Sequence, residues 1–508
     1  MLGPLKIQLA EPVLGVAWLS FEFDSIGYRR SFAGVDASPI NPWMMLPFGL
    51  MLGAVALAPL FFGKWWLKHY AKVAIGLAAV TLAYYFFGLK APHRVWEVAQ
   101  EYISFIALIG SLFVVSGGIH INVKGESTPM VNVAFLLIGA LLANVLGTTG
   151  ASMLLIRPWI RMNKYRITAY HVVFFIFIIS NVGGCLTPIG DPPLFLGYIY
   201  GIPFWWVAEH CLPMWALGIG MLLAMFYVMD RRNFNRAPRD VREKETAHEE
   251  WRFDGLGNIL FLAMILLAVF VKHPPFLREA LMIAAAAGSY FTTKKSVHES
   301  NSFNFHPIIE VAVLFVGIFA TMMPALDWLA GNAREFLGQA PAVGVFYWGT
   351  GSLSSALDNA PTYLSFLSAS FGTFVNHDVI AQVQAHIASG AIDFSNLTGP
   401  HAEQIRQTLE ALHKYHGDHV LAKAVTEQEI EVCFLLGNAT FTKYILAISI
   451  GAVFFGANTY IGNGPNFMVK AIADHAKVRS PSFLEYIWRY TLPFMFPVLI
   501  VIWLVFFR

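Results

Sequence analysis

Charged residues are scarce in this sequence. Of 508 residues, only 13% are Asp, Glu, Lys or Arg and 56% are hydrophobic, whereas a soluble domain carries roughly 25% charged residues. The mean hydropathy is +0.57. This composition indicates an integral membrane protein with the lipid bilayer as its solvent. The net charge of +2 provides no basic surface for a nucleic acid.

Cysteine and the common catalytic motifs are also rare or missing. The three cysteines, Cys185, Cys211 and Cys433, lie in or beside apolar segments and form neither a disulfide framework nor a zinc-binding spacing. His120 and His171 stand outside any H-E-x-x-H motif, and no P-loop or dinucleotide fingerprint occurs. We therefore expect no metal centre, no cofactor and no enzyme activity, and we expect an ion gradient to supply the energy. A carrier, unlike a membrane enzyme, would release its substrate unchanged.

The alternating pattern of a β-barrel is absent as well, which leaves a helical bundle. Apolar runs near twenty residues, the length that spans about 30 Å as a helix, occur at 43–62, 71–88, 102–119, 205–229, 258–272, 276–292, 307–325 and 483–507. The first begins near Pro42 after a mixed polar stretch, so we expect no ordinary cleaved signal peptide.

The basic residues predict an orientation. If "KWWLKHYAK" at 64–72 connects the first two helices on the cytoplasmic side, and if 130–156 enters and leaves the membrane on one side, then 157–168 and the basic linker 231–257 are cytoplasmic too. A polar insertion at 373–432 then lies outside. We expect this multi-pass protein in a plasma membrane, the inner membrane of a bacterium.

An internal repeat divides the chain. "TPIGDPP" at 187–193 and "TYIGNGP" at 459–465 share the pattern T-x-I-G-[DN]-x-P, and each follows another polar, broken segment, 141–158 or 351–366. With the orientation above, the two halves have inverted topology, which places a transport site at their interface. The expected domains are 1–100 with two scaffold helices, 101–230 as first repeat, 231–305 as linker and connecting helices, and 306–508 as second repeat.

The breaks in the apolar segments supply candidate site residues. Glycine and proline interrupt the helices, so backbone groups lose their partners where each orphan costs several kcal/mol. Cations or anionic substrate groups can satisfy them. Asp191 and Asp358 are the strongest candidates for ion or proton binding, because an aspartate at the bilayer centre costs roughly 2.5–3.5 kcal/mol. The amide and hydroxyl candidates, which could equally serve as interhelical hydrogen-bonding groups, are Asn144, Thr148, Thr149, Asn181, Thr187, Asn359, Thr362, Asn458, Thr459, Asn463 and Asn466.

These segments resemble a known superfamily. "LANVLGTTGASMLLIRP", "SNVGGCLTPIGDPP", "SSALDNAPT" and "ANTYIGNGPN" are similar to the ion transporter superfamily, which includes citrate transporters, divalent anion/sodium symporters, arsenite pumps and NhaD-type sodium/proton antiporters. The resemblance runs from about residue 100 to the end. It implies an all-α polytopic membrane protein with two inverted repeats, each with a re-entrant hairpin and a discontinuous transmembrane helix, as well as a homodimer and elevator-like alternating access.

Two branches of the superfamily compete as predictions of function. "TPIGD" and "LDNAP" resemble NhaD-type signatures, which implies a sodium/proton antiporter with Na⁺ as the transported ion and Asp191 and Asp358 as its ion and proton residues. "IGDPP" and "IGNGPN" also look like the Thr/Ser-Pro-Pro-Asn stretches of symporters for citrate or dicarboxylates, although the hairpin tips at 143–145 and 358–360 match only partly. The basic residue closest to the two discontinuous helices' breaks is Lys470. We expect the antiporter, with a Na⁺- or H⁺-coupled citrate symporter as the alternative; another anion or metalloid substrate, or a channel or receptor, also stays open.

The polar insertion predicts two further helices, at 378–388 and 401–414. In the second, Ile405, Leu409 and Leu412 form one apolar face, as in a helix lying on a larger body. Six of the sixteen histidines lie in this insertion, including His413, His416 and His419. A metal-binding or pH-sensing role stays open, but surface histidines need no function and no cysteine accompanies them.

Overall fold

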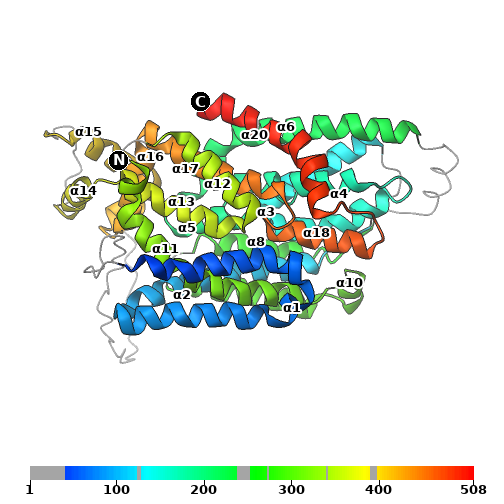
Figure 1. Ribbon diagram of the computed structural model, residues 1–508, viewed down its shortest axis with the longest axis horizontal. Helices are drawn as coiled ribbons and strands as arrows, with labels where there is room; N and C mark the ends of the chain where they lie inside the picture. Colours follow the sequence, from blue (N-terminus) through cyan, green and yellow to red (C-terminus); the bar gives the residue numbers. More distant parts are fainter. Residues whose placement is uncertain are drawn as a thin grey trace, which may run out of the picture.

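The protein is described here by a computed structural model that covers residues 40–122, 128–236, 252–271, 274–301, 303–338, 341–389 and 398–508. Long helices run side by side along the longest axis (Figure 1). The α-helices are α1 (Leu46–Ala83), α2 (Pro92–Gly117), α3 (Pro129–Met162), α4 (Ala169–Ile178), α5 (Pro192–Ile199), α6 (Phe204–Arg236), α8 (Asn258–Ala268), α9 (Leu277–Thr292), α10 (Lys295–Ser300), α11 (His306–Leu337), α12 (Val343–Ala356), α13 (Asn359–Phe374), α14 (His377–Ser389), α15 (Ala402–Leu421), α16 (Glu427–Gly437), α17 (Ala439–Phe455), α18 (Gly464–His475), α19 (Phe483–Tyr486) and α20 (Phe496–Ile502).

Shorter elements join or extend these helices. The 3₁₀ turns are η1 (Pro42–Met45), η3 (Val182–Leu186) and η4 (Gly456–Asn458), and the π-helical segments are η2 (Tyr84–Gly88), η5 (Ile487–Met495) and η6 (Trp503–Phe507). The strands β1 (His120–Asn122) and β2 (Arg252–Asp254) pair in an antiparallel ribbon, with Ile121 opposite Phe253.

Within the described residues, nine helical segments are long and apolar enough to cross a membrane, so the expected all-α polytopic fold is confirmed. They are Pro42–Pro59, Phe61–Gly88, Pro92–Gly117, Pro129–Met162, Ala169–Leu186, Phe204–Arg236, His306–Leu337, Ala439–Asn458 and Phe483–Phe507. The runs at 258–272 and 276–292 differ from expectation, because α8 and α9 have only 11 and 16 residues. At about 1.5 Å per residue, both are shorter than about 30 Å of hydrocarbon.

The connection between the first two spans also differs from expectation. The segment 64–72 is helical and belongs to the second span, while the chain reverses at Phe62 (φ −133°, ψ 37°). This segment contains no glycine or proline that would stop a helix. Of the expected domain boundaries, those at 100 and 231 fall inside α2 and α6, whereas α11 begins at His306, next to the third.

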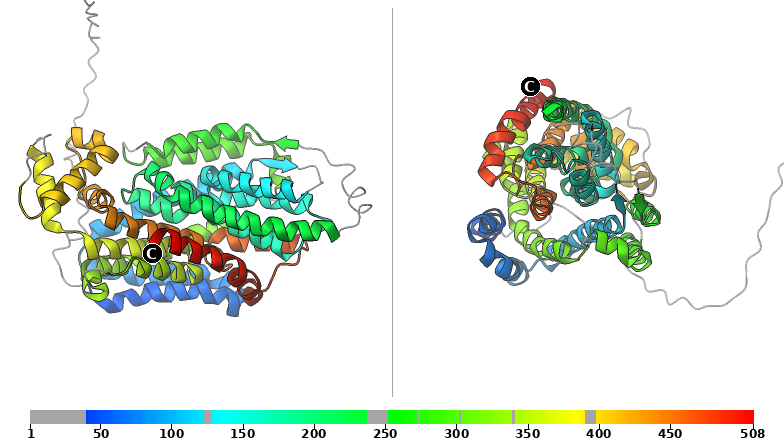
Figure 2. Two further views of the ribbon diagram at one scale, coloured as in Figure 1. Left: turned by 90° about the horizontal axis from the view of Figure 1, so that it is seen from above. Right: turned by 90° about the vertical axis from the view of Figure 1, so that its right-hand side faces the viewer.

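The two polar regions lie at opposite ends of the bundle. The helices of the insertion, α14 and α15, form one end, and the β1–β2 ribbon, whose strand β2 belongs to the expected basic linker 231–257, lies at the other (Figure 2). The insertion folds as expected, and Ile405, Leu409 and Leu412 are buried. This arrangement agrees with opposite sides of a membrane; which end faces the cytoplasm stays a prediction.

The centre of the bundle contains the helices that lead into the two breaks. Residues 170–178 of α4 are all buried, and so are residues 444–455 of α17. The three cysteines are free and buried in this interior or beside it. The breaks that follow α4 and α17 are therefore held inside the protein and not at its lipid-facing surface.

Candidate functional site

Two interruptions of the central helices have nearly the same backbone. α4 continues through η3 and an extended stretch into α5, and α17 continues through η4 into α18. The residues before α5 and α18, Asp191 (φ −142°, ψ 141°) and Asn463 (φ −153°, ψ 140°), are both extended. Neither side chain caps its own helix, so both are available for other contacts.

A threonine fixes each break in the same way. The Thr187 hydroxyl donates to the Asn144 carbonyl at 2.6 Å and accepts the Gly190 amide at 3.1 Å. In the second half, the Thr459 hydroxyl donates to the Ser355 carbonyl at 2.6 Å. It accepts the Gly462 amide at 3.1 Å. The repeated T-x-I-G pattern therefore encodes a turn that is tied to the preceding broken segment.

The preceding segments reverse or bend next to these turns. α3 breaks at Gly147, whose φ of 72° favours glycine, and the Thr148 amide beyond it donates to the Gly190 carbonyl at 2.7 Å. In the second half, α12 ends at Ala356 and α13 begins at Asn359. Asp358 caps α13, because its Oδ1 accepts the Ala360 amide at 3.1 Å.

Asp191 is the point where these four segments meet. Its carboxylate is fully buried. Oδ1 accepts hydrogen bonds from the Thr148 hydroxyl at 2.8 Å and the Asn463 amide at 3.0 Å, and Oδ2 accepts one from the Asn359 amide at 2.7 Å. All three donors are neutral. Within the part of the chain that the structure describes, no Lys, Arg or His forms an ion pair with Asp191.

A network of asparagines surrounds this carboxylate and satisfies the broken backbone. The Asn181 amide donates to Asn466 Oδ1 at 2.7 Å, and the Asn466 amide donates to the carbonyls of Gly456 and Thr459. The Asn144 amide donates to the Gly183 carbonyl, and its Oδ1 accepts the Leu186 amide. These amides therefore satisfy backbone groups that the breaks leave without helical partners.

The remaining predicted residues lie around this centre without contacting Asp191. Asn458 donates to the Ser355 hydroxyl at 2.8 Å. Thr362 donates to the Asp358 carbonyl at 3.0 Å, and Thr149 is half-buried. Lys470 is paired with Asp474 on its own helix, one turn away. Asn359 Oδ1 and Asn458 Oδ1 are buried acceptors that have no hydrogen-bond partner among the described residues.

The contacts relate the two broken segments residue by residue. Asn144 corresponds to Ser355, since both carbonyls accept a hydrogen bond from the threonine of a T-x-I-G turn. Thr148 then corresponds to Asn359, and both donate to Asp191. Thr148 follows Asn144 by four residues, and Asn359 follows Ser355 by the same number. Ser355 itself was missed.

Comparison with known proteins gives one family. The family model described as "Putative citrate transport" matches residues 37–507. The match includes both breaks, both polar segments before them and the first two spans, so it extends further toward the N-terminus than the resemblance seen in the motifs. No curated protein matches the chain.

Proposed function

Since the chain belongs to the family described as "Putative citrate transport", we propose that this membrane transporter carries citrate or a similar small carboxylate together with a coupling cation. It would work as a secondary active transporter, with Na⁺ or H⁺ as the coupling ion. Its coupling site would lie at Asp191, between the two breaks.

The buried charge of Asp191 carries this proposal. Taking a carboxylate out of water costs several kcal/mol unless a cation or a proton compensates it. Three neutral donors lower that cost but do not neutralise the charge. A proton or a Na⁺ ion would do so, and because both need the same oxygens, they would replace one another.

Oxygen atoms near Asp191 suit a hard cation. Asn359 presents its amide to Asp191 while its Oδ1 lacks a partner among the described residues. Carboxylate, amide and backbone oxygens are the ligands that hard cations prefer. We infer that Asp191 and Asn359 would contribute the first ligands, with carbonyls of the broken helices nearby.

Sodium/proton antiport is the second candidate, and the lack of a cation for an anionic substrate favours it. Among the described basic residues, Lys470, the closest to the breaks, pairs with Asp474. The amides of Asn181, Asn463 and Asn466 all donate to protein acceptors. A citrate site would therefore need these donors to rearrange, whereas exchange of Na⁺ for H⁺ would not.

Transport by purified protein in liposomes with an internal pH dye separates the two. We expect labelled citrate to accumulate under an inward Na⁺ or proton gradient, and Asp191→Asn to reduce uptake at least tenfold. Asp474→Asn is the matched control, because Asp474 is a partly exposed carboxylate in α18 and should leave uptake unchanged.

Two results would contradict this proposal. Internal alkalinisation driven by Na⁺ alone, without citrate uptake, would identify the antiporter. Undiminished citrate uptake by Asp191→Asn would remove Asp191 from the coupling mechanism while leaving the substrate assignment intact.

A further inference from the structure

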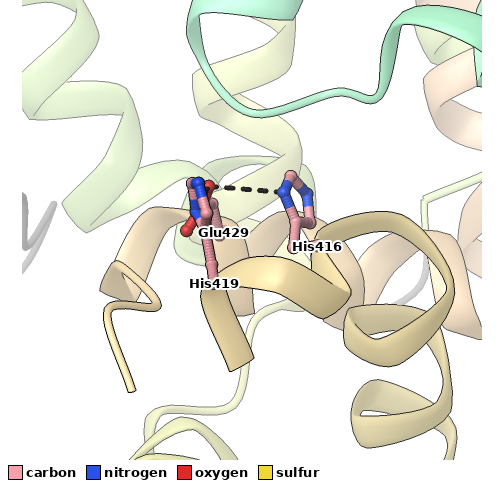
Figure 3. A group of neighbouring side chains, drawn as sticks. All are labelled: His416, His419 and Glu429. Carbon is pink, nitrogen blue, oxygen red and sulfur yellow. Dashed lines mark ion pairs between the residues drawn. The ribbon is translucent and has the colours of Figure 1, made fainter. Parts of the chain in front are cut away.

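Two histidines and a glutamate converge in the polar insertion, far along the molecule from Asp191. His416 and His419 lie on α15 and Glu429 lies on α16, and their side chains point toward one another (Figure 3). Glu429 Oε1 is 3.3 Å from His416 Nδ1 and 2.8 Å from His419 Nδ1. One potential ligand atom from each residue lies within 4.8 Å of those of the other two.

The local backbone aims these side chains at one point. His416 and His419 are three residues apart, which places them on one helix face, and α15 deviates from helical geometry at His416 (φ −135°, ψ 32°). Glu429 belongs to a capping box. Its Oε2 accepts the Thr426 amide at 3.0 Å, and its own amide donates to the Thr426 hydroxyl at 3.2 Å. This leaves Oε1 directed at the imidazoles.

The cluster has unused ligand atoms in a buried place. His416 is only 8% exposed, and among the described residues neither of its ring nitrogens, nor Nδ1 of His419, makes a hydrogen bond of acceptable geometry. Such buried polar atoms are normally satisfied. Oε1 of Glu429 faces both imidazoles, so a carboxylate and two imidazole nitrogens could share one metal ion.

We propose that His416, His419 and Glu429 bind one divalent transition-metal ion of the Zn²⁺ type. Two imidazoles and a carboxylate favour zinc over Mg²⁺ or Ca²⁺, which prefer all-oxygen sites. Zinc bonds of about 2.1 Å in a tetrahedron separate neighbouring ligand atoms by roughly 3.4 Å, close to the 3.3 Å between His416 Nδ1 and Glu429 Oε1. Three protein ligands leave the fourth position for water.

The sequence predicted no metal centre, because it has neither a zinc-binding cysteine spacing nor an H-E-x-x-H motif, and it left a metal-binding role of the insertion's histidines open without an accompanying cysteine. A site with two histidines and one carboxylate needs no cysteine. The third ligand was hidden, because Glu429 lies ten positions after His419, beyond the end of α15, and only the packing of α16 on α15 brings it close.

Metal binding would clamp α15 to α16. α16 also lies beside the turn after α5, where a Cβ built on Gly201 would be 3.5 Å from the Val432 side chain and 3.9 Å from the Glu429 backbone. α5 begins directly after Asp191. The metal would therefore stabilise the insertion and the support for the far end of α5.

The test measures zinc bound to the full-length, tag-free protein in detergent. After loading with Zn²⁺ and desalting, we expect one zinc per chain by elemental analysis, and competition with a fluorescent chelator should show at least tenfold weaker binding for His416→Ala and Glu429→Gln. Zinc should raise the unfolding temperature of the wild type and not that of the variants. Glutamine also serves in a capping box, so Glu429→Gln should remain folded.

His413→Ala is the matched control. His413 lies on the same helix, but its Nδ1 contacts the Leu409 carbonyl at 2.9 Å and it stands outside the cluster. It should bind zinc like the wild type. If the wild type retains no zinc, or if zinc content and thermal shift are the same in wild type, His416→Ala and Glu429→Gln, the metal site does not exist and the cluster is an ion-paired contact.

Discussion

The two breaks have the same backbone conformation but differ in charge. In both, a threonine binds the carbonyl of the preceding broken segment and accepts the amide of the glycine three residues later. The next residue is Asp191 in the first half and Asn463 in the second. The backbone arrangement is thus duplicated, whereas only the first half carries a carboxylate at this position.

The asparagine explains how the two halves can approach so closely. Asn463 donates its amide to Asp191 at 3.0 Å. Two carboxylates at that separation would repel each other by roughly 5 kcal/mol at an effective dielectric constant of about 20. An amide in place of a carboxylate at position 463 therefore turns a repulsion into a hydrogen bond with Asp191.

Substitution of Gly462 tests the backbone arrangement of the second break. A Cβ on Gly462 would lie 2.6 Å from the Gly456 carbonyl oxygen and 2.7 Å from that of Ser354, whereas one on Gly464 would meet nothing within 4 Å. We expect Gly462→Ala to destabilise the protein by about 3 kcal/mol because backbone atoms cannot move aside easily. Gly464→Ala should change stability by less than about 0.5 kcal/mol.

Thermal unfolding of the purified variants measures this difference. Gly190→Ala should resemble Gly462→Ala, because its Cβ would meet the Gly184 carbonyl in the same way. Equal unfolding temperatures for Gly462→Ala and Gly464→Ala would show that the second break is not rigid.

Substitution of Thr148 tests how the Asp191 carboxylate is stabilised. Its hydroxyl donates to Asp191, while the neighbouring Thr149 is half-buried and has no described contact with that carboxylate. A hydrogen bond to an ionised group contributes about 1.5–3 kcal/mol, so Thr148→Val should lower the free energy of unfolding by that amount and also weaken ion-dependent transport. Thr149→Val should change stability by less than about 0.5 kcal/mol.

Unfolding in denaturant and liposome transport check both variants. Equal effects of Thr148→Val and Thr149→Val would mean that the hydroxyl of Thr148 does not stabilise the Asp191 carboxylate.

Substitution of Asp358 has the smallest expected effect and tests whether Asp358 and Asp191 have different roles. Its described side-chain contact is the helix cap to Ala360, and asparagine caps helices about as well as aspartate. We expect Asp358→Asn to change stability by less than about 0.5 kcal/mol, Asp358→Ala to cost about 1 kcal/mol, and Asp358→Asn to reduce transport less than Asp191→Asn does.

Comparing the unfolding temperature and transport rate of Asp358→Asn tests this ranking. If Asp358→Asn has a normal unfolding temperature but transports as poorly as Asp191→Asn, Asp358 has the ion-binding role that the sequence predicted.

The sequence was informative where residue type determines the structure. Low charge and long apolar runs predicted the membrane fold, and T-x-I-G-[DN]-x-P marked both breaks because only glycine and proline interrupt an apolar helix so clearly. Thr148, Asn359 and Asn463 were predicted as site residues and all contact Asp191.

The sequence was less informative where backbone groups or packing decide. Ser355 binds Thr459 through its carbonyl, which every residue type possesses, and its hydroxyl meets Asn458 only because the fold brings the two segments together. The short α8 was read as a span because hydropathy does not show where a helix ends. α9 matches the apolar run at 276–292 but is only 16 residues long. Glu429 was overlooked because its partners lie on another helix.

The burial of Cys185, Cys211 and Cys433 has a practical consequence. A reagent that cannot cross the bilayer and modifies only accessible thiols would meet a nearly silent background in the unaltered protein. Single cysteines could then be introduced without first removing the native ones, for instance at Lys295 near the ribbon end or at Leu421 in the insertion, both strongly exposed. The sidedness of the molecule is therefore open to direct chemical labelling.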